Sequence, residues 1–278
     1  MTDVLAAPHT VDTATCSGEV HDQGAQVTRW APVGVEPVLY VSTAVRCAPG
    51  TPIRAGIPVC WPWFGPGRTG DLEPAHGFLR GAPWELVDRT STDDGVVFVH
   101  RVSDETVGSP HWPYRYAVQL RSSLGAQLEL SLTTTNLAEE AFDYEEALHG
   151  YLRVGDIRSV RVTGLDGRPF YDKVAKGERV QSGDLTFSSE IDAVFRTQDP
   201  VTLHDPVLGR RITVRTSGAG NVVVWNPWAA KAKQVPDIGD DDWMQFVCVE
   251  GANALEDAVS LGPGEAHTTT YHLTVESL

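Results

Sequence analysis

Three segments of the chain combine residue types that can do chemistry. Each is rich in Trp, Pro, Gly, His and Arg together, and they span Pro52–Trp84, Phe142–Ile157 and Val222–Asn253. Imidazole transfers protons near neutral pH, carboxylates act as bases, and guanidinium groups hold phosphate through paired hydrogen bonds. A sandwich core needs alternating aliphatic side chains instead. We therefore expect these segments to form long loops or irregular strands that line a concave site.

The rest of the chain consists of short β-type runs separated by turn residues, with little helical periodicity. Two of these runs, Tyr114–Leu120 and Gln127–Thr135, predict a hairpin with alternating faces, and Asn221–Trp225 predicts a further strand. Glycine and proline are spread over the chain rather than gathered in a linker. The sequence thus predicts one all-β domain over residues 1–278, a large antiparallel β-sandwich with few short helices, in which residues 1–15 are loosely held.

Composition excludes several classes of partner. The chain carries 22 basic and 37 acidic residues, and this net charge of −15 argues against binding to nucleic acid or to an anionic membrane surface. Residues 1–10 contain neither a basic nor an apolar stretch of the kind found in signal peptides, and no segment is apolar enough to cross a bilayer, so we expect a cytoplasmic protein. Its four cysteines form no C-x-x-C pair, so no metal site is predicted.

Five blocks of sequence carry a more specific signal. They are PIRAGIPVCWPWFG (Pro52–Gly65), PAHGFLRGAPWEL (Pro74–Leu86), ALHGYLRVGDI (Ala147–Ile157), EIDAVF (Glu190–Phe195) and VWNPW (Val224–Trp228), the last continuing to Cys248–Glu250. In this order, from about residue 25 onward, they resemble the hexose-6-phosphate mutarotase branch of the aldose 1-epimerase superfamily. Five colinear blocks are far more specific than one short motif. The resemblance implies the galactose mutarotase-like sandwich with a sugar-binding cleft, and an isomerase that needs no cofactor.

The exchange of sugar anomers requires one base and one acid on either side of C1. The base removes the proton of the C1 hydroxyl while the acid protonates the ring oxygen, and the ring opens to an aldehyde that closes again from its other face. The resemblance assigns Glu250 as the base and His149 as the acid. Ordinary pKa values of about 4.3 and about 6.5 predict a charged carboxylate at Glu250, and an imidazole at His149 that holds a proton if an acidic neighbour raises its pKa.

The resemblance also assigns residues that bind the substrate. Asp192 is expected to accept hydrogen bonds from sugar hydroxyls, and His76 to bind or orient the ring. Arg54 and Arg80 are expected at the phosphate end, because a guanidinium forms two parallel hydrogen bonds to phosphate oxygens. Together with Arg68 they predict a local cationic group within an acidic chain.

Each of these residues also has a plainer interpretation. His76 is equally typical of a buried histidine that braces its loop. Arg54 and Arg80 are equally compatible with loop braces that pair with Glu73 or Glu85. Glu250 follows an apolar run, and the alternative to a cavity position is a carboxylate at the end of a strand, in solvent.

Aromatic and acidic residues near the blocks invite two further predictions. Trp61, Trp63 and Trp228 are candidates for apolar walls against the sugar, with core packing as the alternative. The acidic run ending at Asp242 lacks the spacing of a calcium loop, and a short helix near Trp243 with Asp242 as its N-cap is expected instead.

The sequence departs from the resembled pattern at Ala55, Ala75, Gly150, Leu152 and Ala193. None of these departures removes the acid, the base or an arginine. The sequence therefore favours an isomerase acting on a hexose 6-phosphate, with glucose 6-phosphate as the expected substrate and a monomer or weak dimer as the expected state. Two rival functions remain: an aldose 1-epimerase for unphosphorylated sugars, and a noncatalytic carbohydrate-binding sandwich.

Overall fold

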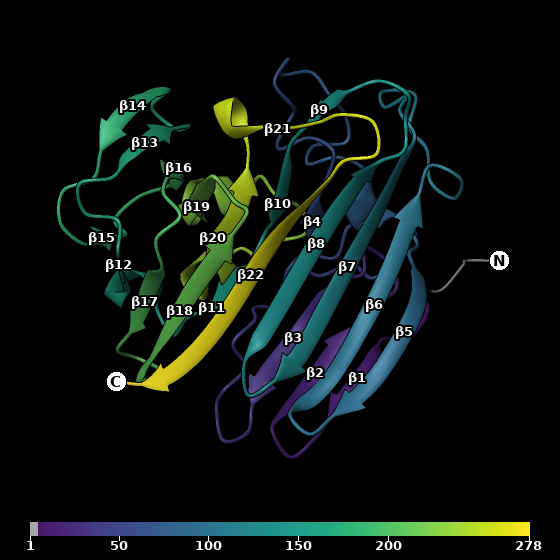
Figure 1. Cartoon of the computed structure of the whole chain (residues 1–278). Coiled ribbons are helices and arrows are strands. Elements are labelled where there is room, and N and C mark those ends of the chain that lie inside the picture. Colours follow the sequence, from purple (N-terminus) through teal and green to yellow (C-terminus); the bar gives the residue numbers. More distant parts are fainter. Residues whose placement is uncertain (1–4) are drawn as a thin grey trace.

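The computed structural model of the chain describes residues 5–278, and it is built almost entirely from antiparallel strands. Figure 1 shows one broad sheet running across the front of the molecule, with the other sheets behind it. The prediction of a large antiparallel β-sandwich is confirmed. No helix among residues 5–278 is long and apolar enough to span a membrane.

The front sheet has nine strands, and the main sheet behind it has eight. In spatial order the nine are β15 (Leu185–Thr186), β12 (Arg161–Thr163), β17 (Val201–Asp205), β18 (Arg210–Ser217), β22 (Ala266–Ser277), β8 (Leu128–Asn136), β7 (Tyr116–Gly125), β6 (Gly95–Ser103) and β5 (Glu85–Thr92). The eight are β14 (Gly177–Val180), β13 (Pro169–Asp172), β16 (Ile191–Arg196), β19 (Asn221–Asn226), β20 (Phe246–Asn253), β10 (Glu146–Leu148) and β4 (Val59–Cys60), with β11 (Tyr151–Arg153) also paired to β20.

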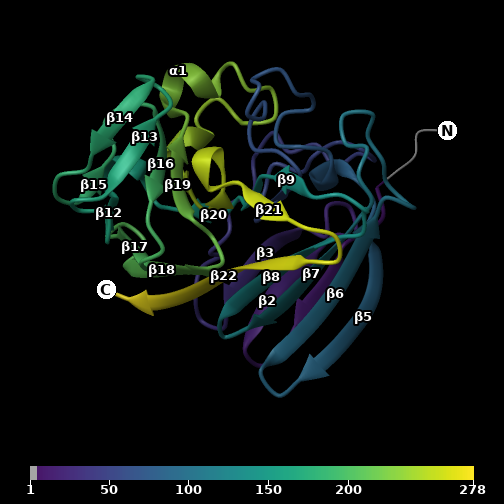
Figure 2. The ribbon, with the colours of Figure 1, turned by 45° about the horizontal axis from the view of Figure 1, so that its top comes forward.

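Smaller elements complete the two layers. They are a three-stranded sheet of β1 (His9–Asp12), β2 (Cys16–Val20) and β3 (Val27–Pro32), a pair of β9 (Phe142–Tyr144) and β21 (Val259–Leu261), helix α1 (Trp228–Ala232), and the 3-10 helices η1 (Leu79–Gly81), η2 (Ile157–Ser159), η3 (Asp242–Met244) and η4 (Leu255–Asp257). Strands β2 and β3 contact β7, and β20 contacts β22, so both rear sheets share a core with the front sheet (Figure 2).

The predicted hairpin is β7 and β8, which pair as far as Leu124 opposite Leu128. Both strands alternate buried and less buried residues, and the alternation continues through Ser122–Gly125, so the strands run further than predicted. The predicted strand at Asn221–Trp225 is β19. Within the segment predicted to be loosely held, residues 9–12 form β1, which pairs with β2 just beyond it, and residues 1–4 of that segment lie outside the described residues.

The prediction that Asp242 caps a helix is wrong in its detail. A 3-10 helix does occur there, but Asp242 is its first residue and makes no cap. Its carboxylate instead accepts the backbone N–H of Thr43 at 2.9 Å and of Gly239 at 3.0 Å, and the hydroxyl of Tyr40 at 2.5 Å. The acid therefore ties the loop before η3 to the segment that follows β3.

Strand β20 is buried along its whole length. A Cβ at Gly251 would meet Thr216 of β18 and Tyr271 of β22, so this side of the strand faces the front sheet. The other side carries Cys248 and Glu250, because side chains alternate along a strand. Burial on both sides explains why Phe246–Val249 reads as a continuous apolar run rather than an alternating one.

Gly150 is required by a close approach from the front sheet. The hydroxyl of Tyr271 donates to the carbonyl oxygen of Val249 at 2.6 Å, and a Cβ on Gly150 would lie 2.3 Å from that hydroxyl oxygen. The small residue at this departure from the family pattern thus makes room for Tyr271.

We expect Gly150→Ala to lower the free energy of unfolding by about 1–3 kcal/mol, because the added methyl overpacks a buried contact. Chemical denaturation measures the change. Gly177→Ala is the matched control, because nothing lies within 4 Å of a Cβ at that strand position. Equal effects of the two substitutions would contradict the packing argument.

Candidate active site

Strand register places His149 opposite Glu250. Strands β10 and β11 both pair antiparallel with β20, with Leu148 opposite Gly251 and Tyr151 opposite Cys248. The two positions between these strands, 149 and 150, therefore lie opposite 250 and 249. The Nε2 atom of His149 is 3.3 Å from Oε1 of Glu250, and both side chains are almost fully buried. The two residues to which the sequence assigns acid and base roles thus meet.

These two side chains form the floor of a pocket of about 120 Å³. Pockets for drug-sized ligands occupy roughly 300–1,000 Å³, so this one suits a single small ligand. Its lining residues are Arg54, Phe64, His76, His149, Lys173, Asp192, Trp225, Val235 and Glu250. The structure therefore brings five of the six predicted site residues together around one pocket: Arg54, His76, His149, Asp192 and Glu250. The sixth, Arg80, is not among the lining residues.

Burial works against charge on both members of the pair. It lowers the pKa of His149 well below its usual value, and nearby Arg54 and Arg80 lower this pKa further. Burial also raises the pKa of Glu250 well above its usual value, and the negative charge of Asp192 adds to this effect. Both shifts favour the neutral forms of the two groups, so burial opposes the charged carboxylate predicted for Glu250.

His149 is held by an aromatic stack that Arg54 supports. The rings of His149 and Tyr151 stack with centroids 4.8 Å apart and an interplanar angle of 16°. Arg54 donates from Nη1 to the Tyr151 hydroxyl at 2.6 Å, and from Nε and Nη2 to the carboxylate of Asp237 at 3.1 and 3.0 Å. Arg54 is thus engaged in an ion pair, with Asp237 rather than the predicted Glu73 or Glu85.

His76 presents a fixed tautomer at the pocket. The backbone N–H of Gly65 donates to its Nδ1 at 3.3 Å, which assigns the ring proton to Nε2. Burial lowers the pKa of His76 well below its usual value, so the ring stays neutral. Its backbone has a φ of 68°, a left-handed conformation that costs about 1–2 kcal/mol for a non-glycine residue. Strain of this kind is typical of functional sites.

Lys173 is a pocket residue that the sequence analysis missed. Its Nζ lies 3.2 Å from Oδ2 of Asp192 and 5.0 Å from the ring centre of Phe64. The lysine directly follows β13, and the pairing of β13 with β16 brings it beside Asp192. No local sequence pattern marks it, because the neighbour that defines its position lies on another strand.

Arg80 adds a positive charge that no carboxylate balances. Its Nη2 donates to the carbonyl oxygen of Ala75 at 2.6 Å, and no acid lies within ion-pair distance of it among residues 5–278. Its charge lowers the pKa of both His76 and His149, so it lies near the pocket. Arg68 does not join this group, contrary to the prediction: it is exposed and lies 3.7 Å from Asp143.

The aromatic walls differ from those expected. Trp61 is fully buried in the main core, and Trp63 is buried as well, so both follow the core interpretation. Trp228 packs on Trp243, with ring centroids 4.5 Å apart. The pocket wall uses Trp225 instead, and its ring meets that of His149 edge to face at 6.2 Å.

Comparison with known proteins agrees with this arrangement. The sequence profile described as "Aldose 1-epimerase" matches residues 9–274. This chain belongs to the aldose 1-epimerase family. A family relative from Salmonella typhimurium, named "Putative glucose-6-phosphate 1-epimerase", is 38% identical over 82% of this chain and 76% of its own length. One of the same name from Escherichia coli is 38% identical over 84% and 79%.

A solved structure of the family superimposes closely. It is that of a "putative mutarotase (YeaD)" from Salmonella typhimurium, with a TM-score of 0.88 and 33% sequence identity, and the match covers 97% of this chain and 90% of that one. A further relative, from Cenchrus ciliaris and also named "Putative glucose-6-phosphate 1-epimerase", is 34% identical over 90% of this chain and 78% of its own length. The family resemblance identified from five blocks is thus confirmed.

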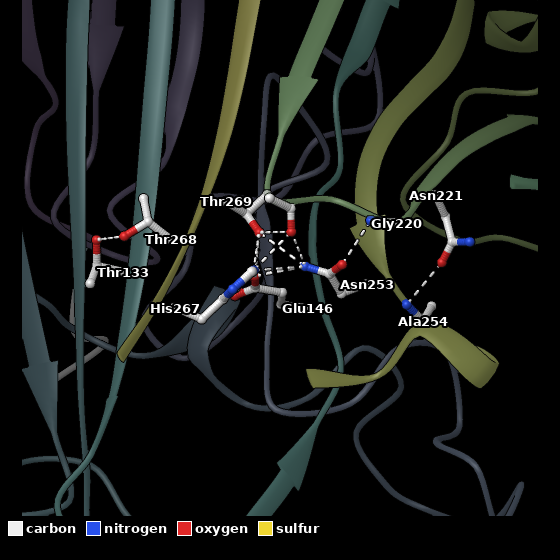
Figure 3. A network of polar contacts seen from close by, with 10 residues as sticks. Thr133, Glu146, Gly220, Asn221, Asn253, Ala254, His267, Thr268 and Thr269 are labelled. Carbon is white, nitrogen blue, oxygen red and sulfur yellow. Dashed lines mark hydrogen bonds and ion pairs between the residues drawn. The ribbon is translucent and has the colours of Figure 1, made fainter. Parts of the chain in front are cut away.

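In this member of the family, a buried polar network fixes the register of β10 against β20. Figure 3 shows Glu146, Asn253, His267 and Thr269 converging. Glu146 lies opposite Asn253 in the β10–β20 pairing, and its Oε1 accepts the Asn253 amide at 3.2 Å and the Thr269 hydroxyl at 2.5 Å. Thr269 belongs to β22, so the network also ties both strands to the front sheet. It lies three residues along each strand from His149 and Glu250.

Glu146 makes stability depend on pH. Burial raises its pKa from 4.5 to about 7, so the folded chain holds a proton that the unfolded chain releases. The stabilisation from this proton is complete below about pH 4.5 and is lost as the pH rises through about 7. We expect Glu146→Gln, which has no such proton, to gain about 2–3 kcal/mol relative to the native chain between about pH 5 and about pH 8.

Denaturant unfolding of both proteins at the two pH values measures this difference. Glu129→Gln on β8 is the control, because the side chain of Glu129 is 45% exposed. A constant stability difference between the native chain and Glu146→Gln across this range would show that Glu146 is ionised when buried.

Proposed function

We propose that this protein is a mutarotase that interconverts the α and β anomers of a hexose 6-phosphate, with glucose 6-phosphate as its substrate. The observation that carries the proposal is the 3.3 Å contact between His149 and Glu250, at a pocket that Arg54, Lys173 and Asp192 also line. A noncatalytic sugar-binding sandwich needs neither an acid nor a base at that place. The names of the three relatives at 34–38% identity support the same reaction and substrate.

The pair needs only one proton to complete the cycle. After the proton of Glu250 moves to His149, the carboxylate takes the proton of the C1 hydroxyl while the imidazolium protonates the ring oxygen. The C1–ring oxygen bond breaks and an aldehyde forms, which leaves Glu250 protonated and His149 neutral. This is the protonation state from which the cycle started and the one that burial favours, so ring opening leaves the pair ready for closure. Closure from the other face of the carbonyl runs the same transfers in reverse.

Three further groups hold the sugar in this proposal. Asp192 accepts hydrogen bonds from ring hydroxyls, and its partner Lys173 both orients its carboxylate and donates to the same ligand. His76 donates from Nε2, because its Nδ1 is occupied by the amide of Gly65. All three face the pocket.

Charge balance supports a phosphorylated substrate. Asp237 neutralises Arg54, and Asp192 neutralises Lys173. Arg80 lies near the pocket and has no carboxylate partner among residues 5–278. We assign the phosphate chiefly to Arg80, with Arg54 as a weaker contact. The rival substrate, an unphosphorylated aldose, would leave this charge without a partner. Four free cysteines suit a reducing compartment and support a cytoplasmic location.

We expect the protein to accelerate the anomer exchange of glucose 6-phosphate. Glu250→Gln and His149→Ala should each lower kcat at least about 100-fold, because general acid–base groups contribute roughly 10²–10⁴. Arg80→Ala should mainly raise KM. Exchange NMR of the two anomers gives these rates, with Arg68→Ala as the matched arginine control. Equal acceleration of plain glucose would overturn the phosphate assignment, and native rates in Glu250→Gln would overturn the mechanism.

The pair also sets the alkaline limit of activity. Loss of its last proton depends on Glu250, whose pKa is raised by burial and Asp192 and lowered by Lys173. We expect Asp192→Asn to move the alkaline limb of kcat/KM to lower pH by about one unit, and Lys173→Met to move it to higher pH. If the alkaline limb of kcat/KM moves in the same direction in both variants, a group other than Glu250 controls it.

A further inference from the structure

A free cysteine lies beside the catalytic pair. Cys248 is two residues before Glu250 on β20, and it faces Tyr151 across the strand pair, so its side chain is on the pocket side of the sheet. The donor atoms of His149, Cys248 and Glu250 all lie within 4.8 Å of one another. The mutarotase chemistry proposed above uses no thiol, so this sulfur has no role in it.

These three donors are the ligand types that zinc selects. Zn²⁺ binds thiolate, imidazole and carboxylate with bonds of about 2.0–2.3 Å, which places tetrahedral ligands roughly 3.3–3.8 Å apart. The His149–Glu250 distance of 3.3 Å already meets this spacing. Movements of about 1 Å bring the sulfur into the same geometry, and the open side of the pocket leaves a fourth position for water or a ligand.

We propose that the catalytic centre is also an inhibitory site for a thiophilic divalent cation, Zn²⁺ above all, bound by His149, Cys248 and Glu250. The binding itself needs only these three side chains, whereas its inhibitory effect rests on the proposed function. A bound cation occupies the imidazole lone pair and the carboxylate, so the pair can no longer take and give the sugar's protons. Substrate and cation therefore exclude each other.

The surroundings favour reversible binding over a resident ion. A histidine that holds a metal usually donates its second ring N–H to a neighbouring acceptor. The Nδ1 atom of His149 has no hydrogen-bond partner within residues 5–278. Loss of such a partner weakens metal sites about 10- to 100-fold, so we expect the cation to exchange readily and to be removed by a chelator.

A second thiol, that of Cys60, offers the main alternative position for the cation. The Sγ atom of Cys60 lies 3.4 Å from Nδ1 of the pocket residue His76. That Nδ1 already accepts the amide of Gly65, so His76 offers no free lone pair on this side. The set around Cys248 is thus the better ligand group.

Cobalt binding tests the site without reference to activity. Titration of the native protein with Co²⁺ is expected to produce thiolate-to-cobalt charge-transfer absorption, and Zn²⁺ is expected to displace it. Cys248→Ala should lose this absorption, and Cys248→Ser should lose it as well, because the smaller change keeps the packing but removes the sulfur. Cys47→Ala is the control, because Cys47 is the exposed thiol. Retained absorption in both Cys248 variants, or its loss in Cys47→Ala or Cys60→Ala, would overturn the proposal.

Inhibition of anomer exchange provides a second test of the metal site. We expect Zn²⁺ to inhibit the native protein in competition with glucose 6-phosphate, with recovery after chelation, and to inhibit Cys248→Ala at least about tenfold more weakly. Cobalt absorption in a protein without mutarotase activity would leave the metal site standing and reject the proposed function. Activity without cobalt absorption would reject the metal site and leave the proposed function standing.

Discussion

The pairing of two short strands with β20 is the constraint on which the site depends. Because β10 and β11 keep one common register along β20, the break between them falls opposite Glu250 and holds His149 there. Opposite residues in an antiparallel pair have Cβ atoms about 4.5–5.5 Å apart, which suits a shared proton. Glu146, Asn253 and Thr269 lock the same register from the opposite side of the sheet (Figure 3). A slip of one residue would turn one of the two side chains, His149 or Glu250, to that other side and separate the pair.

Burial then gives this pair its chemistry. Both groups are kept from solvent, so each is pushed toward its neutral form, and a single proton is enough for the two. The charges around them are matched locally, Arg54 with Asp237 and Lys173 with Asp192. In an acidic chain of net charge −15, Arg80 lies near the pocket without an ion-pair partner among residues 5–278.

The sequence predicts the fold class and the hairpin through local alternation, and the five colinear blocks single out His149 and Glu250, which the structure brings together. It does not predict how charges are paired. Lys173 and Asp237 are defined by contacts between strands or loops far apart in the chain, and no spacing rule links them to Asp192 or Arg54. The direction of the pKa shift of Glu250 was also out of reach, since depth of burial follows from both sheets together. For the same reason the sequence does not predict which tryptophan lines the pocket. Trp61, a candidate for the pocket wall, fills the core, and Trp225 lines the pocket instead.

The place of β20 in the sequence also bears on the order in which the pocket forms during synthesis. His149 precedes its partner Glu250 in the chain, and β22, which contacts β20, follows both. Nascent chains that end before Glu250 contain His149 and several other pocket residues, yet they lack the carboxylate that lies opposite the imidazole. The two side chains can meet only after β20 has docked, so their pairing is a late step of folding.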